Sequence, residues 1–222
     1  MSKITTITQI LSISTALIAS GGMVTLTLFD VPELQSQPSS RSLPSIRWLF
    51  SRGSHIFPQA SALSSLGFSY LAYTSLPTTT ISSSRPLLLN MLLHGKVPFY
   101  IAAALSTISI APVTTFMMIP TNFKLIKLNE DKGGARSARS AQQLGNQPRV
   151  QQGRTAEDSV AGEGQAEEFT DLSGPQTKTK QDSTEEEDQE VNRLLGEFGR
   201  LNAVRAVLIG FGGVVGLATA LM

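Results

Sequence analysis

The feature that most constrains this chain is an uncharged, apolar run from Val97 to Ile119. At a rise of 1.5 Å per residue, a helix of this length reaches roughly the ~30 Å of a bilayer's hydrocarbon layer. Strands in soluble cores are much shorter than this run. The run therefore predicts a membrane-spanning helix, and the rest of the chain has to be organised around it.

Prolines interrupt this run and set its predicted shape. Pro112 lacks a backbone donor and is expected to bend the helix. The hydroxyl groups of Thr114 and Thr115 are suited to re-satisfy the backbone groups around the bend. Pro120 is expected to end the helix at the membrane surface, with Asn122 in a polar patch just beyond it.

Three further apolar runs, residues 4–29, 55–76 and 203–222, predict three more spans. The second run is rich in serine and gives the weakest signal. The stretch from Pro32 to Arg52 carries prolines and arginines and is expected to be a loop. The sequence therefore predicts an all-α fold, a four-helix transmembrane bundle whose first three helices lie within residues 1–129.

Small residues predict where these helices pack closely. In the last run Gly212 and Gly216 form a G-x-x-x-G pair, which lets a neighbouring helix approach. In the first run a small-residue face is expected at Ser12, Thr15, Ala19 and Gly22.

The region between the third and fourth spans has a different composition. Of the chain's 17 acidic residues, 15 lie between Glu130 and Glu197. Residues 130–182 have almost no periodic apolar positions and are expected to form a long, disordered polar insertion. Ser183 and Glu186 have the spacing of a capping box, so residues 183–222 are expected to form an amphipathic and then a transmembrane helix.

Composition excludes several kinds of site. The chain has no cysteine and two histidines, which excludes disulfides and thiolate ligands and predicts no metal site. A net charge of +1 gives no indication of nucleic-acid binding. The apolar runs predict an integral, multi-pass membrane protein in contact with lipid, and we expect it in an endomembrane. Lys and Arg near the span ends predict that the insertion lies on the cytoplasmic side.

Polar side chains gather at one predicted rim of the bundle. Trp48 precedes the second span, and the other members lie near span ends on the same side: His55, Asn122, Asn202 and Arg205. Helical spacing predicts one inward face of the last helix, made of Phe198, Asn202, Arg205, Ile209, Gly212 and Gly216.

Each polar residue also has a non-catalytic interpretation. Trp48 beside arginines is typical of an interfacial anchor, and His55 fits an interfacial histidine. Asn122 fits a helix-end cap. Arg205 is costly inside a membrane unless it extends its guanidinium to lipid phosphates. From the residues alone these alternatives stay open.

Four motifs together resemble a known family. They are G-x-x-x-T-x-x-x-x-D-x-P-x-L at 21–34, W-x-x-x-x-x-x-H-x-x-P at 48–58, APVTTFMMIPTN at 111–122 and LNAVRA at 201–206. This combination is similar to the small, membrane-bound anthrone oxygenases of fungal polyketide pathways. The resemblance touches all four predicted spans and omits the insertion.

The resemblance implies an oxidoreductase that converts an anthrone, such as emodin anthrone, into the anthraquinone. It implies O2 as co-substrate, no cofactor, and a place in secondary metabolism, including anthraquinone and mycotoxin biosynthesis. On this hypothesis His55 is the base, and Arg205, Asn122 and Asn202 stabilise the oxyanion. The aromatic polyketide would contact Trp48, Phe116, Met117, Met118 and Phe198, although such residues are also common in plain packing.

A competing class is a non-enzymatic, four-helix membrane scaffold or a small transporter. In that case the same polar groups only fix the register of the helices. The glycines at 210–216 follow no predicted strand, so they do not indicate a phosphate-binding loop.

Overall fold

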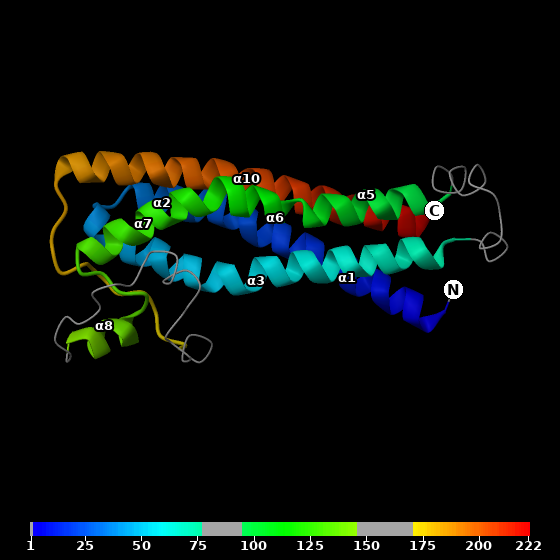
Figure 1. Ribbon diagram of the computed structural model, residues 1–222, viewed down its shortest axis with the longest axis horizontal. Helices are drawn as coiled ribbons and strands as arrows, with labels where there is room; N and C mark the ends of the chain where they lie inside the picture. The colour runs from blue at the N-terminus through cyan, green and yellow to red at the C-terminus, as the bar shows by residue number, and fades with distance from the viewer. Residues whose placement is uncertain (1, 77–94, 146–170) are drawn as a thin grey trace. The chain divides into compact units, whose positions relative to one another are not determined.

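The structure is a computed structural model, which describes residues 2–76, 95–145 and 171–222. Within these residues it is all-α, with no strand, so the predicted fold class is confirmed. Figure 1 shows the elements, which are α1 (Lys3–Thr25), η1 (Leu26–Asp30), α2 (Val31–Gln35), α3 (Ser39–Thr74), α5 (Val97–Ile108), α6 (Ile110–Pro112), η3 (Val113–Met118), α7 (Ile119–Asp131), α8 (Ala138–Gly145) and α10 (Glu185–Leu221). The η elements are π-helical.

The chain divides into two compact units. Unit 1 comprises Met1–Val24, Phe57–Thr114 and Ala203–Met222. Unit 2 comprises Thr25–Ile56 and Thr115–Asn202. Each unit has its own apolar core, centred on Phe68 and Tyr100 in unit 1 and on Leu43 and Leu195 in unit 2.

Three helical stretches in the described residues are long and apolar enough to cross a membrane. They are Lys3–Gln35, Val97–Asp131 and Glu185–Leu221. These lengths and compositions are consistent with an integral, multi-pass membrane protein. Helix α3, which carries the predicted second span, does not meet the same criterion.

Two of the serines that weaken α3 as a span have partners on α5 inside unit 1. The Ser61 hydroxyl donates to the Thr107 carbonyl oxygen at 2.7 Å, and the Ser65 hydroxyl donates to the Ala104 carbonyl oxygen at 3.0 Å. Both acceptors lie on α5. This face of α3 is therefore a polar contact between helices of unit 1, in keeping with Ser-mediated packing in membrane bundles.

The predicted close approach at the last helix is confirmed in unit 1. A Cβ atom on Gly212 would lie 2.8 Å from the backbone oxygen of Ala103. On Gly216 it would lie 2.3 Å from Cε1 of Phe68. Helix α10 thus packs against α5 and α3 where glycine leaves room. On the small-residue face of α1, Ser12 and Ala19 are buried, as predicted, and Thr15 and Gly22 are half-buried.

The expectation that Pro120 ends the helix is wrong. Helix α7 continues through it to Asp131, with the proline in its first turn, where a missing N–H costs nothing. The preceding π-helical segment, η3, contains the carbonyl of Phe116, four residues before Pro120. Pro32, in the first turn of α2, likewise follows the π-helical η1.

The expected loop from Pro32 to Arg52 is also wrong, because most of it belongs to α2 and α3. Pro44 lies inside α3 and cannot donate to the Ser40 carbonyl four residues earlier. In unit 2 the backbone N–H of Thr179 donates to that carbonyl oxygen at 2.8 Å instead. A segment distant in sequence therefore satisfies the group that the proline leaves open, and α3 continues.

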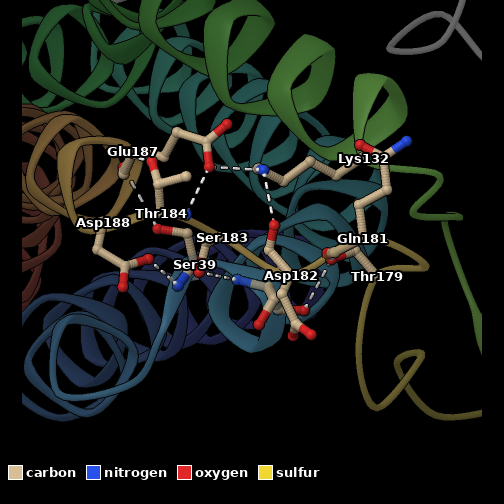
Figure 2. A network of polar contacts seen from close by, with 10 residues as sticks. Ser39, Lys132, Thr179, Gln181, Asp182, Ser183, Thr184, Glu187 and Asp188 are labelled. Atoms are coloured by element: carbon tan, nitrogen blue, oxygen red, sulfur yellow. Dashed lines mark hydrogen bonds and ion pairs between the residues drawn. The ribbon is translucent and has the colours of Figure 1, made fainter.

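The two ends of the insertion differ from the expected disorder. Residues 138–145 form α8, and residues 171–184, which we call the strap, lie against α3 and the end of α7 within unit 2. Figure 2 shows Lys132 as a junction, with its Nζ 2.7 Å from a Glu187 carboxylate oxygen and 3.2 Å from the Asp182 carbonyl oxygen. The expected disorder of residues 146–170 lies outside the described residues.

The capping box of the last helix lies one residue later than predicted. Glu187 Oε2 accepts from the Thr184 backbone N–H at 2.7 Å, and the Thr184 hydroxyl accepts from the Glu187 N–H at 3.4 Å. Ser183, the predicted cap, instead accepts from the backbone N–H of Ser40 at 3.3 Å.

We expect Gly212→Ala to destabilise the protein by about 1–3 kcal/mol, because the new methyl group would overlap Thr107 and a backbone oxygen. Gly21→Ala is the matched control, since a Cβ atom there meets nothing within 4 Å. The control should match the wild type or gain up to ~1 kcal/mol of helix propensity. Thermal unfolding in detergent, followed by circular dichroism, measures both, and equal stability of the two variants would contradict the close approach.

Candidate functional site

Helix α3 carries the first two candidate residues in unit 2. Trp48 and His55 are seven residues apart, which places them two turns apart on the same face. Both are half-buried. The indole Nε1 of Trp48 donates to the Ser173 carbonyl oxygen at 2.9 Å, and the Arg52 guanidinium carbon lies 5.2 Å from the centre of the ring. Trp48 is thus held by specific contacts in unit 2.

Asn122 lies in the first turns of α7, in the same unit. Its Oδ1 atom is buried and has no hydrogen-bond partner among the described residues. A buried amide oxygen without a donor costs free energy, on the order of 1–3 kcal/mol. The arrangement therefore leaves one buried hydrogen-bond acceptor without a partner among the described residues.

Helix α10 contributes two buried candidate residues to unit 2. The ring of Phe198 packs against Phe50, with centroids 5.1 Å apart. Asn202 is fully buried, and its Nδ2 donates to the Thr27 hydroxyl at 3.1 Å. The predicted inward face of the last helix is confirmed, because all six of its residues are buried: Phe198, Asn202, Arg205, Ile209, Gly212 and Gly216.

Arg205 belongs to unit 1, where it is only 5% exposed. Its guanidinium carbon lies 5.8 Å from the centre of the Phe57 ring. A cation over an aromatic face gains electrostatic attraction, more so when it is desolvated. This burial favours an interior role for Arg205 over extension to lipid phosphates.

Phe116 and Met117 do not point inward. They are 77% and 54% exposed, whereas the next residue, Met118, is 1% exposed and belongs to the core of unit 2. Exposed apolar side chains on a spanning helix suit contact with lipid. Their predicted contact with the substrate stays a prediction, and the structure adds no support for it.

One polar pair in unit 2 was not predicted. The buried Thr121 hydroxyl donates to Oε1 of Glu197 at 2.9 Å, and the Arg193 guanidinium lies 3.6 Å from the other oxygen of that carboxylate. Thr121 lies in the same twelve-residue motif as Asn122. Glu197 itself could have indicated this pair, because it is an acidic residue among apolar positions about one turn before Leu201 and Asn202.

Unit 2 therefore contains seven of the eight predicted site residues, of which Trp48, His55, Asn122, Phe198 and Asn202 are at least half-buried. The set offers an imidazole, amides and apolar or aromatic surface. Among the described residues no group of three or more His, Cys, Asp or Glu side chains is placed to hold a metal ion.

Comparison with known proteins gives one match. The family model of anthrone oxygenase matches residues 47–156. The matched region includes Trp48, His55 and Asn122, and it ends before the strap and α10. No curated protein and no solved structure matches the chain. The match over these residues confirms the resemblance to the anthrone oxygenase family inferred from the motifs.

Proposed function

We propose that this protein is a membrane-bound oxygenase that converts a polyketide anthrone of the emodin anthrone type into the corresponding anthraquinone with O2. The observation that carries the proposal is the family match over residues 47–156, which includes a half-buried histidine and a buried amide oxygen. Stretches of spanning length and hydropathy also suit a planar, apolar substrate that partitions into a bilayer.

The reaction balances without an external reductant. A base removes a proton from the central methylene of the anthrone, and the resulting anion donates electrons to O2 as a carbon–oxygen bond forms. Protonation gives a hydroperoxide. Loss of the second methylene proton breaks the O–O bond, forms the new carbonyl and releases the second oxygen atom as water. Anthrone and O2 therefore give anthraquinone and water, and the substrate carbon supplies all four electrons.

In this proposal the protein supplies a base, stabilisation of the anion and an apolar environment. His55 is the base, because an imidazole has a pKa suited to proton transfer near neutral pH. The Nδ2 groups of Asn202 and Asn122 are the donors that orient and hydrogen-bond the developing oxyanion of the reacting ring. Arg205, in unit 1, remains a prediction: its guanidinium would stabilise the developing negative charge on the substrate. Substitution of Arg205 would test this role separately.

We expect membranes that contain this protein to convert emodin anthrone faster than empty membranes, since the compound also oxidises slowly unaided. The acceleration should require O2 and persist in the presence of a chelator. Absorbance of the anthraquinone, with O2 uptake and heat-treated membranes as controls, measures it. No acceleration with this anthrone or a related one would favour the non-enzymatic membrane scaffold or transporter instead.

We expect His55→Ala to lower the enzyme-dependent rate by roughly 10²–10⁴-fold, the usual contribution of a general base. Added imidazole should restore part of the rate. Gln59→Ala is the matched control, because Gln59 is exposed one turn further along α3. Full turnover by His55→Ala protein at a normal expression level would rule out the base.

We expect Asn122→Ala to lower kcat by about 10²–10³-fold if the amide hydrogen-bonds the developing oxyanion. A merely structural asparagine would change stability more than kcat. Lys124→Ala, at an exposed position on the same helix, serves as the control. Single-turnover assays on both variants separate the chemical step from binding, and an unchanged rate for Asn122→Ala would remove this residue from the mechanism.

A further inference from the structure

The strap, residues 171–184, makes specific contacts with the face of α3 that carries Trp48. Two backbone carbonyl groups of the strap accept hydrogen bonds from side chains of α3. The Ser173 oxygen accepts from Trp48 Nε1 at 2.9 Å and from Arg52 at 3.4 Å. The Asp171 carbonyl oxygen accepts a second hydrogen bond from Arg52. Both side chains are thus attached to one short turn of the strap.

The Asp171 side chain holds that turn in shape. Its Oδ1 accepts from the Ser173 N–H at 2.9 Å and from the Ser173 hydroxyl at 2.6 Å. Its Oδ2 accepts from the hydroxyl of Ser137, just before α8. Three donors on one carboxylate fix the direction of the two carbonyl groups that Trp48 and Arg52 use.

The carboxylate is ionised at neutral pH, as this role requires. Burial would raise the pKa of Asp171, but hydrogen bonds from Ser137 and Ser173 and the charge of Arg52 outweigh that effect and lower it. Because the pKa is lowered, these hydrogen bonds persist above the usual value of about 4 and weaken only as the pH falls below it.

The strap is anchored along the rest of its length as well. The Gly174 carbonyl oxygen accepts from the Ala138 N–H at 2.9 Å, and the Gln176 side chain accepts from the Ala135 N–H at 2.7 Å. Near its other end Thr179 bonds Ser40 at the start of α3. The strap therefore follows the first half of α3, from Arg52 back to Ser40.

We propose that the strap is a positioning device for Trp48, in which Asp171 shapes the turn that fixes the indole and the neighbouring guanidinium. Asp171 and Ser173 are positioning residues and lie outside the region matched by the family model, whereas Trp48 and Arg52 lie within it. This assigns part of the insertion a role in the site. Its consequence for the substrate rests on the proposed function, whereas its effect on Trp48 does not.

The test uses the chain's single tryptophan, so that intrinsic fluorescence reports on Trp48 alone. In detergent-solubilised full-length protein, Asp171→Ala should shift the emission to longer wavelength and increase quenching by acrylamide, towards the values of urea-unfolded protein. Asp171→Asn retains an acceptor for Ser173 and should give a smaller shift. Asp182→Ala is the matched control, because that exposed strap carboxylate pairs with Lys178 and not with the turn at residues 171–173 that bonds Trp48, so the emission should stay unchanged.

Circular dichroism shows whether each variant keeps its helices, and Asp171→Asn keeps the test valid if Asp171→Ala does not fold. Unchanged emission and quenching in folded Asp171 variants would overturn the proposal, as would an equal shift in Asp182→Ala.

In the anthrone assay we expect Asp171→Ala to raise KM and leave kcat unchanged. If the wild type is inactive, the proposed oxygenase function fails. The fluorescence result still shows whether Asp171 positions Trp48, so the two proposals can be tested separately.

Discussion

The structure depends on what happens to backbone carbonyl groups that prolines leave without a donor. In a bilayer such a group has no water to bond, so each proline inside a long helix has to be accommodated locally or by a distant partner. Pro32 and Pro120 each follow a π-helical segment and lie in the first turn of the next α-helix. At Pro44 the distant backbone N–H of Thr179 bonds the open carbonyl oxygen of Ser40. The helices therefore continue where proline usually ends them.

This constraint also decides which site residues could be predicted from the sequence. Helix α10 contains no proline and no π-helical segment, and spacing by 3.6 residues placed all six predicted residues of its inner face correctly. In η3 the wider π turn shifts the face, so that Met118 is buried while Phe116 and Met117 are exposed. The spacing rule applies to α10 because it assumes an uninterrupted α-helix, whereas the substrate contacts of Phe116, Met117 and Met118 were implied by the resemblance and not by spacing.

Composition predicted the all-α class and the separation of apolar from polar segments, but it misjudged the ends of the insertion. The rule for disorder weighs apolar burial against chain entropy. The strap is instead held by polar contacts to groups far away in sequence, such as the Thr179 backbone N–H, which donates to the Ser40 carbonyl oxygen at 2.8 Å across 139 positions. Lys132, whose side chain is 8% exposed, joins the strap to the start of α10 in the same way. Pairings of this kind leave no periodic signal in a single sequence.

The placement of polar groups follows from the same physical argument. In unit 1 the serines of α3 bond backbone carbonyl groups of α5, and glycines bring α10 close, so polarity there fixes helix contacts. In unit 2 the Asn122 oxygen has no partner among the described residues, although packing around it is close enough to bury it. A buried polar group interacts more strongly in a low dielectric and costs more when unpaired. An amide oxygen only accepts, so the group that would satisfy it has to donate a hydrogen bond, as a hydroxyl group of a bound aromatic polyketide would under the proposed function.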